Sequence, residues 1–297
     1  EAKRYLMDSV GCALGGAQQH DVHIAREVLT ETAGSGNCRI LVTGELWDPV
    51  SASLLNALMI RVMDYNDIYW KQDPSHPSDL IPAAMAAAER AGGSGRDLIV
   101  GIALAYEFEQ RLCEVSFPGV REIGWHHATL TAAAAPIAAA RMLGLEAEQM
   151  QHAIGISASR HCTTGSVTAG KLTMMKNTVD PMATQSGMLA ALLAERGYTG
   201  PEHVLDGHGH VEGGECFGDL RLHVHPKNGL CRCASIQALR LITDNRIHPH
   251  PRLVARTPRP GVGGLGDQRA REVRDVGRGG GDRSGRNQGG RSLPGPV

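Results

Sequence analysis

Polar side chains gather most densely between residues 64 and 79, after an apolar segment that we expect to be helical. They combine one imidazole with several carboxylates and amides: Asp64, Asn66, Asp67, His76 and Asp79. A carboxylate beside an imidazole can fix its tautomer and set its basicity, which suits general acid–base catalysis. Because Pro77 follows His76, the backbone of His76 favours extended conformations. The alternative is a connecting loop whose Asp and Asn side chains only cap the flanking helices.

Two further clusters carry basic side chains. His126 and His127 stand together at the expected start of a helix. Neighbouring residues on one helical turn point in different directions, so we expect at most one of them to face a given site. The alternative is a pair that serves only the core and the helix cap. Lys176 lies among apolar residues, where a lysine either extends to water or is held for an anionic ligand.

The sequence gives little support to metal or iron–sulfur chemistry. The seven cysteines are scattered and contain no C-x-x-C pair. This pattern argues against a disulfide framework, a cysteine zinc site and an iron–sulfur cluster, and it favours the cytoplasm. Three histidine pairs lack a carboxylate or cysteine at a spacing that completes a metal site: His208 with His210, His223 with His225, and His248 with His250. We expect no metal and no cofactor.

Composition excludes some partners. The 297 residues carry a net charge of −1 at a pI near 7.0, and 42% of them are hydrophobic. A near-neutral chain has no overall field to attract nucleic acid or an anionic membrane. We find no apolar run of about 18 residues that would span a bilayer and no secretory signal at the beginning of the sequence. We therefore expect a globular cytoplasmic protein with neither nucleic acid nor membrane as partner.

Alanine-rich helices must position these clusters. Good helix formers alternate with glycine stops, and Ser94 is a candidate helix cap. The expected helices span 52–63, 80–90, 97–112, 129–143, 146–156 and 180–196. Short extended segments are expected at 37–43 and 220–225. The pattern predicts a mainly α protein built as a compact helical bundle.

Composition changes abruptly near residue 251. Residues 251–297 contain 12 glycines and 10 arginines with no lysine and no aromatic residue. Such a segment cannot bury enough apolar surface to offset the entropy of ordering, so we expect it to be disordered. Binding of RNA through an arginine–glycine segment is the functional alternative, although aromatic residues for base stacking are absent. An out-of-frame reading of GC-rich DNA would produce a similar composition.

The polar loop also carries a resemblance to a known family. Asp64-x-Asn66-Asp67 followed by His76-Pro77-Ser78-Asp79 resembles the loop signature of the MmgE/PrpD family. The spacing from Asp64 to His76 resembles that of its 2-methylcitrate dehydratases, whereas the loop is shorter in its cis-aconitate decarboxylases. The similarity extends over residues 1 to about 230 and includes an early helix over 2–16, the segments 124–127 and 142–145, and Lys176.

The resemblance implies a fold and a set of site residues. It implies a helical domain over 1–215, the start of a smaller, incomplete α+β domain over 216–250 and the tail over 251–297. It assigns catalytic roles to Asp64, His76, His127 and Lys176. It assigns substrate binding to Asn66, Asp67, Asp79, His126, Arg160 and Lys227. One departure is Ile68, where the family usually has threonine; another is that family members are much longer.

The function implied by the resemblance is metal-independent dehydration of 2-methylcitrate to 2-methyl-cis-aconitate in propionate catabolism, by a homodimer. A neutral histidine can take the proton next to a carboxylate and a protonated one can assist the leaving hydroxyl, although the sequence does not assign these two roles. A tricarboxylate needs cationic partners such as Lys176 and Arg160. Alternatives within the family are a cis-aconitate decarboxylase or a diacid epimerase. Outside it, the alternatives are an inactive truncated fragment and an RNA-binding protein.

Overall fold

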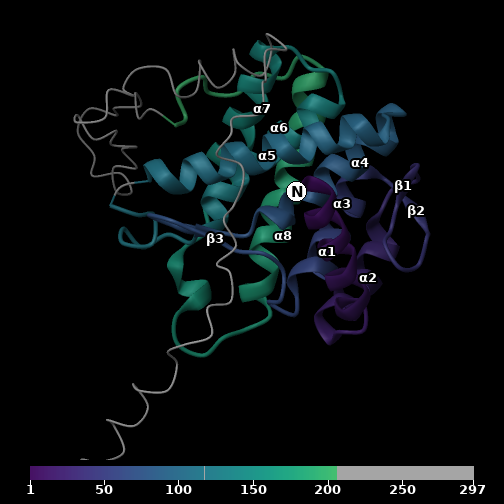
Figure 1. The fold of residues 1–297 in the computed structure, drawn as a ribbon, viewed down its shortest axis with the longest axis horizontal. Helices are drawn as coiled ribbons and strands as arrows, with labels where there is room; N and C mark the ends of the chain where they lie inside the picture. The colour runs from purple at the N-terminus through teal and green to yellow at the C-terminus, as the bar shows by residue number, and fades with distance from the viewer. Residues whose placement is uncertain (117, 206–297) are drawn as a thin grey trace, which may run out of the picture. The chain divides into compact units, whose positions relative to one another are not determined.

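The computed structural model describes residues 1–116 and 118–205, and these are mainly helical, as predicted (Figure 1). Eight α-helices are described: α1 (Ala2–Gly16), α2 (His20–Thr32), α3 (Pro49–Arg61), α4 (Ile81–Ala91), α5 (Gly95–Val115), α6 (Ala128–Met142), α7 (Ala147–Arg160) and α8 (Met175–Glu195). The predicted strand at 220–225, Lys227, the expected α+β segment at 216–250 and the tail at 251–297 lie outside the described residues.

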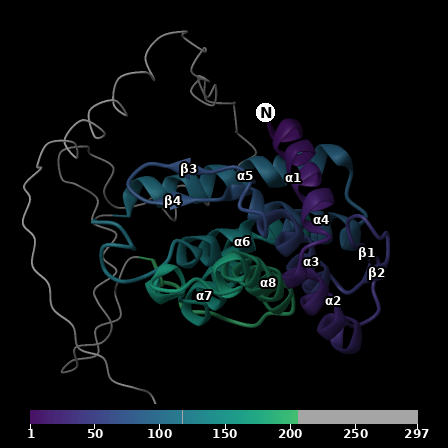
Figure 2. The same ribbon diagram turned by 90° about the horizontal axis from the view of Figure 1, so that it is seen from below.

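Helix α6 forms the centre of the bundle because its alanines allow close approach on every side. All of its residues except Arg141 are buried. It packs against α4, α5, α7 and α8, and Figure 2 shows it between α5 on one side and α7 and α8 on the other. Gly187 of α8 is part of this contact: a Cβ atom there would lie only 2.4 Å from the Cβ of Ala135. Small side chains thus set the distance between these helices.

The ends of the helices follow local chemistry. The side chain of Ser94 caps α5 and forms a reciprocal capping box with Asp97, as its sequence position predicts. Gly92 ends α4 in the left-handed conformation with φ of 66°. Helix α8 begins five residues before the predicted start at 180, with Pro181 inside it. Its first turn is held to the end of α3, because the Asn177 amide donates to the Val62 carbonyl at 2.9 Å.

Strand content is small in the described residues, and two short antiparallel hairpins account for it. β1 (Cys38–Arg39) pairs with β2 (Leu46–Trp47), so only part of the extended segment expected at 37–43 forms a strand. β3 (Tyr69–Trp70) pairs with β4 (Pro74–Ser75) inside the polar loop that joins α3 to α4. A short 3-10 helix, Pro77–Leu80, then leads directly into α4. This loop is therefore folded and anchored at both ends.

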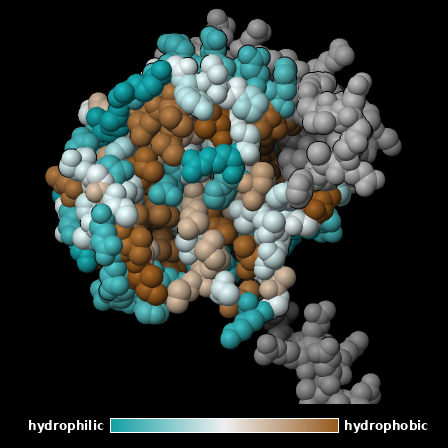
Figure 3. Space-filling view, turned by 180° about the vertical axis from the view of Figure 1, so that it is seen from behind, coloured by the Kyte–Doolittle hydropathy of each residue, from teal (hydrophilic) through white to brown (hydrophobic). Residues whose placement is uncertain are grey.

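The surface mixes polar and apolar side chains. On the face opposite to that of Figure 1, apolar patches lie between polar ones (Figure 3). Some large apolar side chains are well exposed, including Met7 at 72%. None of the helices in the described residues has the length and hydropathy to cross a membrane.

Candidate active site

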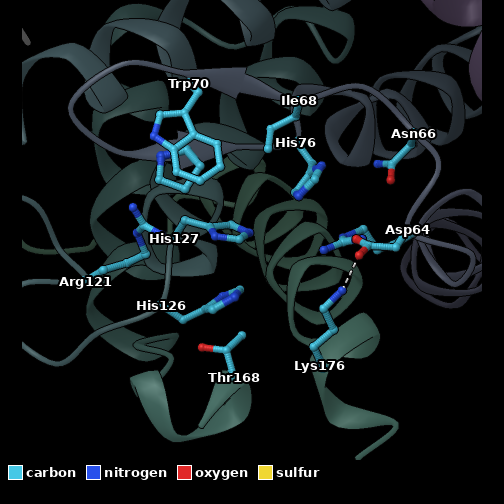
Figure 4. A pocket seen from close by; sticks show the side chains of 12 residues that line it. Asp64, Asn66, Ile68, Trp70, His76, Arg121, His126, His127, Thr168 and Lys176 are labelled. Atoms are coloured by element: carbon cyan, nitrogen blue, oxygen red, sulfur yellow. Dashed lines mark hydrogen bonds and ion pairs between the residues drawn. The ribbon is translucent and has the colours of Figure 1, made fainter. Parts of the chain in front are cut away.

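A cavity of about 340 Å³ opens where the loop after α3, the segment before α6 and the first turn of α8 meet (Figure 4). This volume suits a small organic ligand. It is lined by Arg61, Asp64, Asn66, Ile68, Trp70, Pro74, His76, Arg121, His126, His127, Thr168 and Lys176. Three of these side chains are cationic and one is anionic, so the lining favours an anionic ligand.

Most of the predicted site residues meet at this cavity. Six of the ten line it: Asp64, Asn66, His76, His126, His127 and Lys176. Asp67 and Asp79 lie directly behind the lining, in contact with it through hydrogen bonds or ion pairs. Arg160 is exposed at the end of α7 and is not among the lining residues.

The expectation that only one of the two adjacent histidines faces a site is wrong. Both His126 and His127 line the cavity, with ring centroids 3.8 Å apart. The pair lies before the first turn of α6, where His127 is the cap residue. The backbone N–H of His126 donates to the Thr163 carbonyl at 2.8 Å. His126 lies outside the helix, in backbone held to Thr163, so its side chain can converge on the same cavity as that of the cap residue His127.

His76 presents a free nitrogen to the cavity. Its Nδ1 lies 2.6 Å from the carbonyl oxygen of Asp67. A carbonyl can only accept, so Nδ1 carries the proton and Nε2 keeps its lone pair in the neutral ring. Burial and the nearby charge of Arg61 lower the pKa of His76 to about 4. His76 is therefore neutral near pH 7 and available as a base.

His126 has the opposite tautomer. The backbone N–H of Ala128 donates to its Nδ1 at 3.2 Å, so in the neutral ring Nε2 carries the proton. Burial and the adjacent His127 lower the pKa of His126 to about 4. The cavity thus contains one neutral histidine able to accept a proton and one able to donate a hydrogen bond.

Arg61 organises the charges behind the cavity. Its side chain is only 2% exposed, and it forms an ion pair with Asp64. Its Nε lies 3.6 Å from Asp79 and 3.5 Å from Asp180, both of which are fully buried. A buried guanidinium needs such compensation, since an isolated charge costs several kcal/mol or more in the interior.

The pKa values of the two buried carboxyl groups beside Arg61 are shifted in opposite directions. Burial and then repulsion by Asp180 raise the pKa of Asp79 well above its usual range. Burial also raises the pKa of Asp180, but attraction by His127 and Arg61 outweighs it and the net shift is downward. Asp180 is therefore the ionised partner, and its Oδ2 lies 3.4 Å from Nε2 of His127. The contact orients the His127 ring, which lies 5.4 Å from that of His76.

Asp64 joins the two cations at the mouth of the cavity. Its carboxylate accepts from Lys176 Nζ at 2.5 Å and also from Arg61. Although burial raises the pKa of Asp64, these two hydrogen bonds dominate and lower it to about 2. Asp64 also has a φ of 56°, a left-handed conformation that is uncommon for a residue other than glycine. Its position is therefore imposed by the surrounding contacts.

A buried acid lies behind the histidines. Glu109 of α5 is fully buried, and its Oε1 accepts from Ser75 Oγ at 2.6 Å and from Thr131 Oγ1 at 2.8 Å. The Thr131 hydroxyl also lies 3.4 Å from Asp180 Oδ1. Burial raises the pKa of Glu109 to about 8, against the effect of the two hydroxyl donors. A protonated Glu109 thus adjoins the ionised Asp180 through one hydroxyl group.

One group in the described residues could bring three donor atoms to a cation. The donor atoms of His126, His127 and Asp180 lie within 4.8 Å of one another. Arg61, however, already lies 3.5 Å from Asp180 and balances its charge. A divalent cation would meet this buried guanidinium at close range, and we assign no metal to the group.

Sequence reasoning missed Arg61, Glu109, Arg121 and Asp180. A signal existed for Arg61, which ends a helix that is otherwise almost free of charge. Asp180 stands between Val179 and Pro181, where the sequence predicts the start of a helix and an acidic residue is expected for that reason alone. Nothing in the local sequence distinguishes Glu109 from the other acidic residues of α5.

Known proteins are similar in sequence to this part of the chain. The sequence model of the MmgE/PrpD N-terminal domain matches residues 1–212. A cis-aconitate decarboxylase of Aspergillus terreus is 28% identical over 215 residues, which cover 69% of this chain and 43% of that protein. The mitochondrial 2-methylcitrate dehydratase of Yarrowia lipolytica is 29% identical over 166 residues, covering 52% and 31%. The 2-methylcitrate dehydratase of Escherichia coli O157:H7 is 27% identical over 164 residues, covering 51% and 33%. The chain spans less than half the length of these relatives.

Proposed function

Because this chain belongs to the MmgE/PrpD family, we propose that it is a lyase that dehydrates a tricarboxylate, with 2-methylcitrate as its substrate. The observation that carries the proposal is the pair of neutral histidines with opposite tautomers, His76 and His126, in a cavity lined by cations. Dehydration needs a base for a carbon-bound proton and donors for the oxygen atoms that gain negative charge.

His76 is the base in this scheme. Its Nε2 lone pair takes the proton next to a substrate carboxylate, and the carbon–carbon double bond forms as the hydroxyl on the neighbouring carbon leaves. His127 donates the proton that converts this hydroxyl to water, because Asp180 at 3.4 Å can balance the charge of its protonated ring. His126 donates its Nε2–H to the carboxylate oxygen that gains charge as the proton is removed.

The cations bind and orient the substrate. Lys176 is 21% exposed and reaches the cavity from the first turn of α8. A substrate carboxylate that approaches Lys176 competes with Asp64, which Arg61 also holds. Arg61 therefore keeps Asp64 in place while Lys176 turns to the substrate. Ile68, on the side of the cavity opposite Lys176 (Figure 4), supplies an apolar contact, and Pro74 is a second apolar lining residue. These contacts suit the methyl group of 2-methylcitrate.

Decarboxylation of cis-aconitate is the second candidate. Similarity to the decarboxylase of A. terreus covers 69% of this chain, compared with 52% for the dehydratase of Y. lipolytica. The spacing from Asp64 to His76, which resembles that of the 2-methylcitrate dehydratases, favours the dehydratase. Both reactions build negative charge next to a carboxylate and would use the same cations.

Turnover measurements separate these candidates. The purified 297-residue chain is incubated with 2-methylcitrate in the presence of a chelator, and the conjugated product is followed by its ultraviolet absorbance. Release of carbon dioxide is measured in parallel with cis-aconitate as substrate. We expect absorbance to rise with 2-methylcitrate and no carbon dioxide from cis-aconitate. The reverse result would replace the dehydratase by the decarboxylase, and a folded chain inactive on both would refute the proposal for this chain.

A further inference from the structure

Arg121 lies in the segment between α5 and α6 and reaches the cavity from the side away from α8. Its Nε lies 3.6 Å from Oδ1 of Asp73, which is itself only 1% exposed. Asp73 is fixed in turn, since its Oδ2 accepts from the backbone N–H of Val120 at 2.6 Å. A carboxylate buried behind the cavity therefore holds the arginine in place and compensates part of its charge.

Trp70 of β3 supports the same guanidinium. The central carbon of the Arg121 guanidinium lies 5.2 Å from the centroid of the Trp70 ring, within the range of a cation–π contact. Trp70 is 61% exposed and, like Arg121, lines the cavity. A planar guanidinium stacked on a ring and paired through Nε keeps its two terminal amino groups in a defined direction.

Those amino groups are unused in the part of the chain that the structure describes. The one ion pair found there for Arg121 is made through Nε. The other two lining cations, Arg61 and Lys176, are both paired with Asp64, the one lining carboxylate. Figure 4 shows Arg121 and Lys176 on opposite sides of the cavity with His126 and His127 between them.

We propose that Arg121, supported by Trp70 and Asp73, binds a second carboxylate of the substrate at the end of the cavity opposite Lys176. A ligand with carboxylates at both ends would then span the histidines, whereas a diacid that pairs with Lys176 alone would not depend on Arg121. Arg121 is thereby a specificity-determining residue for tricarboxylates. This inference rests on the proposed function, since it takes the same cavity as the substrate site.

Binding of an unreactive ligand tests the inference without catalysis. The full chain is titrated calorimetrically with propane-1,2,3-tricarboxylate, which has no hydroxyl group to eliminate, and with succinate. We expect Arg121→Gln to weaken binding of the tricarboxylate about tenfold. This is at the lower end of the range expected for loss of a charge-assisted hydrogen bond, because the arginine side chain is 41% exposed to solvent. Binding of succinate should change less than about twofold. Arg111→Gln is the matched control, because Arg111 is an exposed arginine of α5 that pairs with Glu107 and does not line the cavity.

The outcomes distinguish the role of Arg121 from the proposed lyase function. Equal tricarboxylate binding by Arg121→Gln and the unmodified chain would overturn the role of Arg121 and leave the proposed lyase untouched. Failure of the unmodified chain to bind the tricarboxylate would overturn both. Arg121→Lys, which keeps the charge but loses the planar fork, is the second variant. A similar loss of both ligands in both variants would show that Arg121 only supports its loop, and would also overturn the inference.

Discussion

Glu109→Gln is the substitution that most directly tests the chemistry behind the histidines. Glu109 is fully buried, two hydroxyl groups donate to it, and its pKa is raised to about 8 by burial. The folded protein therefore holds a proton on Glu109 that the unfolded chain releases near its ordinary pKa of 4.5. Between these two values the folded state binds more protons, so this group lowers stability as the pH rises.

The size of this effect on stability follows from the interval between the pKa values of Glu109 in the folded and unfolded states. One proton of difference between the folded and unfolded states corresponds to about 1.36 kcal/mol per pH unit. Between pH 5 and pH 8 the contribution of Glu109 to the free energy of unfolding should fall by about 3–4 kcal/mol. Glutamine cannot ionise and should lose this dependence. The glutamine amide would place its NH₂ group at the position of Oε2, which has no hydrogen-bond partner among the described residues. This should lower the free energy of unfolding by about 1–3 kcal/mol at every pH.

Thermal unfolding of the two proteins at pH 5 and pH 8 measures this difference. The change in Tm between the two pH values should be smaller in the variant by about 10 °C, at about 2–4 °C per kcal/mol for a domain of this size. His76 and His126 also favour folding less at low pH, but they are present in both proteins and cancel in the comparison. Glu107→Gln on the same helix is the control, since Glu107 is 37% exposed and pairs with Arg111.

A variant that folds and shows the same pH dependence as the unmodified protein would refute the reasoning. Glu109 would then be ionised in the folded state at neutral pH, and the assignment of a neutral acid beside Asp180 would be wrong. The expected result would instead establish that Glu109, beside Asp180, keeps its proton at neutral pH in the folded protein.

Three other predictions concern the base, the cation and the helix packing. His76→Asn should abolish turnover while the circular dichroism spectrum stays unchanged. Because the pKa of His76 is lowered to about 4, the acid limb of the pH profile of kcat/KM in the unmodified enzyme should lie well below pH 6.5. Lys176→Gln should weaken tricarboxylate binding about 10- to 100-fold in calorimetry, and unchanged affinity would remove Lys176 from the site. Gly187→Ala should lower stability by about 1–3 kcal/mol or more, since its Cβ would lie 2.4 Å from that of Ala135. Gly11→Ala, with nothing within 4 Å, should raise stability by about 0.5–1 kcal/mol in the same thermal scans.

Local sequence chemistry was enough to predict most of the helices. Alanine-rich segments, the Ser94 cap and the glycine stops at 92, 144 and 197 act within a few residues, and all three glycines adopt positive φ. Helix α2 and strands β2, β3 and β4 were not predicted. The mean hydropathy of α2 is low and only Val22 and Leu29 are buried in it, so its apolar pattern is weak. The two-residue strands depend on pairing across loops, which no local pattern indicates.

The site was only partly predictable, because its chemistry depends on groups that are distant in sequence. Arg61, Glu109 and Asp180 come from α3, α5 and α8, and each is an ordinary charged residue in its own segment. Their separation along the chain hides the fact that one guanidinium serves several carboxyl groups. Tautomers were equally hidden, since they are set by the Asp67 carbonyl and the Ala128 N–H.

The same distant groups explain why His76 and His127 can take different roles in one cavity. Arg61 repels a proton from His76 and lowers its pKa, while Asp180, on the other side of Arg61, faces His127. Asp180 also acts on His76, whose ring lies 5.4 Å from that of His127, but burial and Arg61 outweigh its effect there. Asp180→Asn would remove the carboxylate that balances a proton on His127 in the proposed mechanism, and would leave the Arg61 guanidinium beside that ring without compensation. The variant should therefore keep its base and lose its acid: we expect kcat to fall, while the acid limb of kcat/KM, set by His76, stays in place or moves to lower pH because Asp180 no longer raises the pKa of His76.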